Sequence, residues 1–159
     1  MDLSNVAISG LLSAALAHPY GHVSEGGKKG VPMRVDYRNM VEKWEGKAKN
    51  KKDETDIHGA GFETQDKVGR ATKGSKLEES MRLVNGLYKL GYIMGIKSKK
   101  THGDFEHMAR TSGNKYTKPL VGLSALADLY KAKNPNSKGD LSFSTFGQGA
   151  PGLVYTRKF

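Results

Sequence analysis

The stretch SKLEESMRLVNGLYKLGYIM, from Ser75 to Met94, carries the clearest helical pattern in the chain. Its large apolar residues recur at steps of three and four and form two neighbouring rows. The rows are Leu77, Met81, Val84 and Tyr88, and Leu83, Leu87, Leu90 and Met94. Residues at these spacings share one face of an α-helix, and Ser75 with Glu78 matches a capping box. Because two rows make a wide apolar face, we expect this helix to be central.

Two further apolar segments predict helices that pack with it. One begins at Thr117-Lys118-Pro119, where proline is tolerated in a first turn, and ends at Asn134-Pro135. The other covers residues 3–17, with Asp2 or Ser4 as its cap. Three apolar helices suffice for one bundle core. The sequence therefore predicts a mainly α fold, a small bundle of about four to five helices, in a single domain over residues 1–159 with its helical core at 76–133.

The segment AHPYGHVSEGGKKG, from Ala17 to Gly30, follows the first helix. Pro19 and Gly21 are helix breakers, and further glycines continue to Pro32. This composition predicts a glycine-rich hinge over residues 18–32. The same helix breakers argue against a helical arrangement of the two histidines inside the segment.

Residues 33–75 are predicted to form a basic amphipathic helix followed by a long loop. Tyr37, Met40, Val41 and Trp44 recur at helical spacing among lysines and arginines, and this shared stripe favours a core position for Trp44. From Asp53 to Ser75 the large apolar residues are few, which indicates an irregular segment.

The tail changes to an alternating pattern. LSFSTF (Leu141–Phe146) and LVYTRKF (Leu153–Phe159) flank the turn GQGAPG. Alternation with period two is typical of strands. The sequence therefore predicts a C-terminal β-hairpin over residues 140–159, which must dock on the helices because an isolated hairpin is marginally stable.

The apolar run from Val6 to Ala17 has the length of a signal-peptide core and ends in a small-x-small triplet. The residues before it include Asp2 and no positive charge, which is the wrong flank for a signal. The pattern favours a retained helix, and no segment has the length of a transmembrane helix. The compartment stays open, with an intracellular or assembly setting favoured over secretion.

Composition excludes several classes of chemistry. The chain has 159 residues and no cysteine, so disulfides, thiolate metal sites and cysteine nucleophiles are absent. No GxSxG motif or Walker loop occurs, and GGKKG lacks the Ser or Thr and the preceding strand that a phosphate loop needs.

The formal net charge of +10 predicts attraction to polyanions. Nine lysines or arginines stand against three acids between residues 28 and 52. A second basic cluster follows the central helix. The predicted polyanion-binding residues are Lys28, Lys29, Arg34, Arg38, Lys43, Lys47, Lys49, Lys51, Lys52, Lys97, Lys99 and Lys100. Such side chains provide salt-dependent affinity without sequence specificity, and no known nucleic-acid-binding motif is present.

The histidines suggest an alternative function, which is metal binding. His18 and His22 have the i, i+4 spacing of paired metal ligands, with Glu25 nearby and His58 in the segment read as a loop. His102 with Asp104, and Glu106 with His107, are further candidates. None of these spacings matches an established metal-binding motif, so the main interpretation assigns no catalytic residue, no metal and no cofactor.

We therefore expect a non-enzymatic basic interaction or structural protein, of the kind found in a virion or nucleoprotein assembly. Its expected partners are nucleic acid or an acidic protein surface, together with further copies of itself in a homo-oligomer or larger assembly. The alternative is a metal-dependent hydrolase that uses His18, His22 and His58.

Overall fold

Long helices dominate the computed structural model, which describes residues 2–38, 41–94 and 104–157. Helix α1 (Leu3–Gly10), the π-helical turn η1 (Leu11–Ala17) and α2 (His18–Lys28) join into one continuous segment. The other helices are α3 (Lys51–Ala71), α4 (Glu78–Ile93), α5 (Asp104–Ser112) and α6 (Thr117–Lys133). Two antiparallel hairpins complete the fold, β1 (Met33–Asp36) with β2 (Val41–Trp44), and β3 (Gly139–Ser144) with β4 (Gly152–Arg157). The predicted mainly α bundle with a C-terminal hairpin is confirmed.

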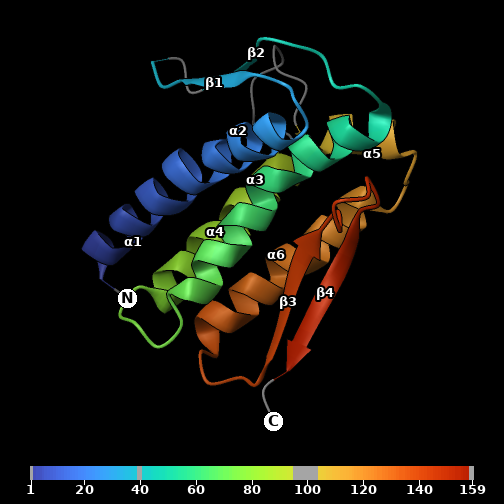
Figure 1. Cartoon of the computed structure of the whole chain (residues 1–159). Coiled ribbons are helices and arrows are strands. Elements are labelled where there is room, and N and C mark those ends of the chain that lie inside the picture. Colours follow the sequence, from blue (N-terminus) through green and yellow to red (C-terminus); the bar gives the residue numbers. More distant parts are fainter. Residues whose placement is uncertain (1, 39–40, 95–103, 158–159) are drawn as a thin grey trace.

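The arrangement places α2 against α3 and α4 against α6 (Figure 1). The hairpin β3–β4 lies along α6, and Leu141 pairs with Tyr155 in its register. A small apolar core joins α3, α5, α6 and β3 through Phe62, Met108, Val121 and Phe143. The hairpin is therefore docked on the helices, as its marginal intrinsic stability requires.

The hinge predicted over residues 18–32 is wrong, because the helix continues to Lys28. The π-helical turn explains how the helix passes the proline. The N–H of His18 already bonds to the carbonyl of Ser13, five residues back, so the α-helical ladder is interrupted before Pro19, which has no N–H to offer. Gly21 serves close packing, since a Cβ there would lie 2.3 Å from the carbonyl oxygen of Ala60.

The basic helix and long loop predicted over residues 33–75 are also wrong. The first part is the β1–β2 hairpin, in which Met33 pairs with Trp44. Trp44 is only partly buried, against its expected core position. The second part is mostly α3, whose first turn is capped by the Asn50 side chain accepting from the Asp53 N–H at 2.8 Å.

The N-terminal helix starts where expected, with the Asp2 carboxylate accepting from the Ser4 N–H at 3.0 Å. The face of this helix that is buried is a polar one, and most of its large apolar side chains are exposed. Ser9 and Ser13 are fully buried, whereas Leu11 is 57% exposed. The Ser9 hydroxyl bonds to Ser80 of α4 at 3.0 Å. The helix thus packs through its small polar side chains.

Candidate metal centre

The two histidines of α2 lie on one face of a regular helix. His18 and His22 are four residues apart, and their side chains are 1% and 2% exposed. Their Nε2 atoms are 3.1 Å apart. The helical arrangement of the two histidines, which Pro19 and Gly21 argue against, is therefore present.

Asp104, the first residue of α5, completes a triangle with the two imidazoles. Its Oδ2 lies 3.2 Å from His18 Nε2 and 3.5 Å from His22 Nε2. The carboxylate is 15% exposed, so all three ligand atoms lie in an interior setting. Residues separated by more than 80 positions in the chain are thus brought to one point.

The size of this triangle fits a bound transition metal. A tetrahedral zinc ion with bonds of about 2.0–2.1 Å has ligand atoms about 3.3–3.4 Å apart, from the geometry of the tetrahedron. The three observed separations are 3.1, 3.2 and 3.5 Å. Two imidazole nitrogens and one carboxylate oxygen are also a set that zinc accepts.

Outer partners orient two of the three ligands. His22 Nδ1 donates to the Ile57 carbonyl at 2.7 Å, which leaves its Nε2 as the atom facing the triangle. Asp104 is held through its second oxygen, because His58 Nδ1 lies 3.0 Å from Oδ1. The four groups therefore form one connected cluster.

Aromatic rings hold the third ligand. The ring of His18 packs edge-on against Phe62 at 4.7 Å and against Tyr88 at 5.1 Å between centroids. Its Nδ1 is buried with no hydrogen-bond partner in the described part of the chain. Packing, rather than an outer hydrogen bond, fixes the orientation of this imidazole.

A glycine makes room for both rings. A Cβ on Gly61 of α3 would lie 2.6 Å from His18 Nδ1 and 2.6 Å from His22 Nε2. Such contacts are shorter than van der Waals separation, so any larger residue would push the imidazoles out of the triangle. The glycine is a requirement of the site rather than a point of flexibility.

The buried Asp104 carboxylate makes a positive charge favourable within the cluster. Burial alone would lower the pKa of His22, but the Asp104 carboxylate outweighs it and raises that pKa to about 9. Burial lowers the pKa of His18. Burial works to raise the pKa of Asp104, yet the three histidines hold it well below its ordinary value. One imidazolium therefore neutralises the carboxylate when only protons are available.

Three of the residues named in the metal alternative come together. His18, His22 and His58 all contact Asp104. Glu25 does not join them, because its carboxylate bonds to Lys28 at 3.0 Å. The sequence pattern groups Asp104 with its neighbours in the chain and not with His18 and His22. His102 lies outside the described residues.

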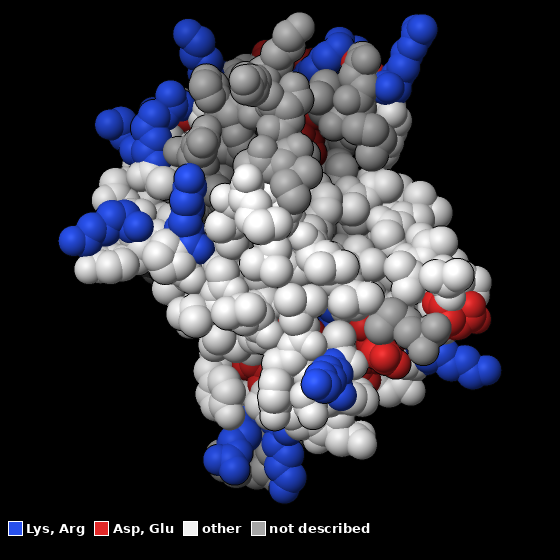
Figure 2. Space-filling model, turned by 180° about the vertical axis from the view of Figure 1, so that it is seen from behind, with Lys and Arg blue, Asp and Glu red and all other residues white. Residues whose placement is uncertain are grey.

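Among the described residues, the predicted polyanion-binding residues divide into those that pair with an acid and those that do not. Four are paired, namely Lys28 with Glu25, Lys29 with Asp53 and Asp56, Arg34 with Glu45, and Lys43 with Asp36. Arg38, Lys47, Lys49, Lys51 and Lys52 are exposed. Lys97, Lys99 and Lys100 lie outside the described residues. On the face shown in Figure 2, Lys and Arg side chains lie around the rim and leave the middle mostly uncharged.

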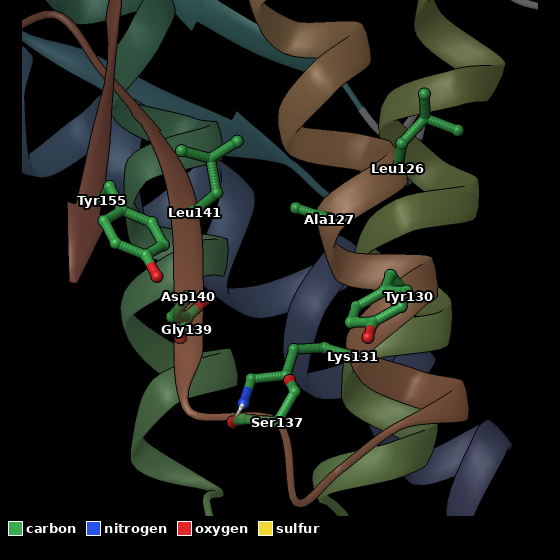
Figure 3. A pocket seen from close by; sticks show the side chains of 9 residues that line it. All are labelled: Leu126, Ala127, Tyr130, Lys131, Ser137, Gly139, Asp140, Leu141 and Tyr155. Carbon is green, nitrogen blue, oxygen red and sulfur yellow. Dashed lines mark hydrogen bonds between the residues drawn. The ribbon is translucent and has the colours of Figure 1, made fainter. Parts of the chain in front are cut away.

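A separate cavity of about 470 Å³ opens between α6 and the C-terminal hairpin. Tyr130 of α6 and Tyr155 of β4 lie on opposite sides of it, and Lys131 bonds to the Ser137 carbonyl at its lower end (Figure 3). Its lining contains none of His18, His22, His58 and Asp104, so it is distinct from that cluster.

Comparisons with known proteins add no function to this geometry. No family model, curated protein or solved structure matches the chain.

Proposed function

We propose that this protein binds a divalent transition metal of the zinc type through His18 Nε2, His22 Nε2 and Asp104 Oδ2. The observation that carries the proposal is the triangle of 3.1, 3.2 and 3.5 Å between these three atoms. Its edges match those of a tetrahedral coordination shell.

A proton on His22 is the alternative occupant of the triangle. His22 Nδ1 already donates to Ile57, so its Nε2 carries a proton only when the ring is cationic, the state that a pKa of about 9 favours at neutral pH. That proton faces the acceptors His18 Nε2 at 3.1 Å and Asp104 Oδ2 at 3.5 Å. A metal ion would displace it and bind all three lone pairs at once.

Three protein ligands leave a fourth position, which is the arrangement of catalytic rather than structural zinc sites. A metal there would supply a water of lowered pKa as nucleophile and would polarise a carbonyl or phosphoryl oxygen. The Tyr92 hydroxyl lies 3.4 Å from His18 Nε2. Burial raises the pKa of Tyr92, so the phenol stays protonated and can donate to a substrate oxygen. We therefore propose a metal-dependent hydrolase.

Metal loading tests the binding part of this proposal. Metal-free protein reloaded with Co²⁺ should show the intense visible absorption of a tetrahedral site, and the variant His22→Ala should lose it. Glu25→Ala is the matched control, because Glu25 lies on the same helix but outside the cluster. Absence of Co²⁺ binding in the folded wild type, or its persistence in His22→Ala, would refute the site.

Activity tests the catalytic part separately. The zinc-loaded protein should hydrolyse activated aryl esters or aryl phosphates, and chelation or His22→Ala should abolish the rate. Tyr92→Phe should retain the metal and lose rate, because only the donor hydroxyl is removed. A protein that binds zinc but shows no metal-dependent rate on either class would contradict the hydrolase proposal and leave the binding proposal standing.

Polyanion binding is the second candidate function. Lys47 and Lys49, just before α3, and Lys51 and Lys52, in its first turn, are exposed and form no ion pair with another described residue. Such a cluster supports salt-dependent contact with phosphates. Replacing these four lysines by glutamine should weaken binding to a generic RNA or DNA and flatten its salt dependence. The same replacement at Lys115 and Lys118 is the control. Equal affinity in both variants would contradict this candidate.

A further inference from the structure

A second group of ligand-type side chains lies beside the proposed centre. Glu54 and His58 are four residues apart on α3, and His107 lies three residues after Asp104 on α5. One ligand atom from each of Glu54, His58 and His107 lies within 4.8 Å of the others. The hydroxyls of Thr55 and Thr111 bond at 2.6 Å and tie the two helices together at this level.

Asp104 connects the two groups. Its Oδ2 faces His18 and His22, while its Oδ1 lies 3.0 Å from His58 Nδ1. Since a carboxylate accepts, His58 Nδ1 carries the proton and its Nε2 presents a lone pair. This carboxylate–histidine arrangement is the usual outer support of a metal-bound imidazole.

The rings of the second group are also held in place. His58 stacks on His107 with centroids 4.6 Å apart and an interplanar angle of 13°. Trp44 of β2 covers His58 at 5.1 Å. Burial and the nearby His58 and Arg110 lower the pKa of His107, which keeps that ring neutral and able to bind a metal.

A cation already lies at this position. Arg110 Nη2 is 2.9 Å from His107 Nδ1 and 3.6 Å from Glu54 Oε1. The Arg110 side chain is 68% exposed, so it can move away at little cost. The Glu54 carboxylate and the His107 ring therefore already favour positive charge between them.

We propose that Glu54, His58 and His107 bind a second divalent metal ion, linked to the first through the His58–Asp104 hydrogen bond. This inference rests on the proposed function, because Asp104 serves as a direct ligand at the first position. The second site is the more accessible one, with side chains 29%, 10% and 24% exposed for Glu54, His58 and His107. We expect it to be the weaker site, since accessible ligands are held less firmly in place.

Zinc titration of the metal-free full-length chain, followed by calorimetry or chelator competition, tests the inference. The wild type should bind two ions per chain, one tightly and one more weakly. His107→Ala and Glu54→Gln should each bind one, with the tight step unchanged. Arg110→Ala should tighten the weak step several-fold, because a competing cation is removed. A merely structural role for these residues would not produce that gain.

The outcomes separate the two proposals. A single tight ion in the wild type, unaffected by His107→Ala, overturns the second site and leaves the first intact. Two ions in both His107→Ala and Glu54→Gln also overturn it. No tight ion in the wild type overturns the first site, and the second falls with it. Circular dichroism of each variant confirms the fold, which these partly exposed positions should tolerate.

Discussion

At the proposed metal site, a proton and a metal ion would compete for His22 Nε2. Burial would lower the pKa of His22, but the Asp104 carboxylate outweighs it and, with a smaller contribution from Glu42, raises that pKa to about 9. A metal can take Nε2 only after that proton leaves. The metal-free site is therefore cationic on His22 throughout the neutral range.

The first prediction follows from this competition. Because one proton is displaced per ion, the apparent zinc affinity should rise about tenfold per pH unit from pH 7 towards 9 and level off above the pKa. Competition with a chelator of known pH dependence measures it. An affinity that stays flat between pH 7 and 9 would show that His22 is not a ligand.

Gly61 gives a second prediction at the same scale. A Cβ added at Gly61 would lie 2.6 Å from His18 Nδ1 and from His22 Nε2. Gly61→Ala should therefore reduce zinc affinity by about tenfold or more, as happens when a metal ligand loses the contacts that orient it. Gly91→Ala is the control, because a Cβ there meets nothing within 4 Å. Equal zinc affinity in the two folded variants would contradict the tight fit between α3 and α2.

The helices show what can be predicted from local pattern. The helices at 78–93 and 117–133 and the C-terminal hairpin were predictable because each carries a regular apolar period. Helix α3 was not, since Ile57 and Phe62 are the only large apolar residues among its buried ones, and most of the others are small or polar, such as Thr55, Gln65 and Asp66. A criterion based on hydrophobic periodicity reads such a face as a loop.

The cap of α3 carries a prediction at this scale. Asn50 Oδ1 accepts from the Asp53 N–H at 2.8 Å, and α3 positions both Glu54 and His58. Asn50→Ala should lower the free energy of unfolding by about 1 kcal/mol. Urea denaturation measures it, and Asn50→Ser should retain most of the stability because it keeps a capping oxygen. Equal losses in both variants would contradict the capping role.

The site illustrates the same limit. The i, i+4 pair His18 and His22 and the nearby candidate His58 were visible in the sequence. Their convergence on Asp104 was not, because it depends on α5 packing against α3 after the chain has passed through the helices between. Pro19 was misleading, since the π-helical turn before it allows the helix to continue.

At the scale of the whole molecule, the interior is unusually polar. Lys89 of α4 is fully buried and donates to Asp66 of α3, Ser124 of α6 and Asp128 of α6, the last at 2.7 Å. Arg82 extends this network from Asp128 to Asp140 of β3. These buried ion pairs link α3, α4, α6 and the β3–β4 hairpin. They hold the helices together in a chain whose apolar core is small.

This network yields a prediction for the whole fold. Lys89→Met leaves the buried Asp66 carboxylate without its cation and Asp128 with Arg82 alone, and it should cost about 3–5 kcal/mol in the free energy of unfolding. Lys28→Met is the control, because the Lys28–Glu25 pair is solvent-exposed and should contribute less than about 1 kcal/mol. Urea denaturation compares them. Similar small losses in both would show that Asp66 and Asp128 are stabilised by something other than Lys89.

Several large apolar side chains face outward, among them Leu11, Leu123, Leu126 and Tyr130. Within the described residues, no helix has the length and apolar character needed to cross a membrane. Self-association stays a prediction of the sequence, and the molecular mass in solution tests it.

The proposed metal position lies between His18 Nε2, His22 Nε2 and Asp104 Oδ2. Anomalous X-ray scattering at the zinc edge, from crystals of the zinc-loaded protein, tests it most directly. We predict a strong peak about 2.0–2.2 Å from His18 Nε2, His22 Nε2 and Asp104 Oδ2. Zinc-loaded crystals with no peak inside this triangle would contradict the account.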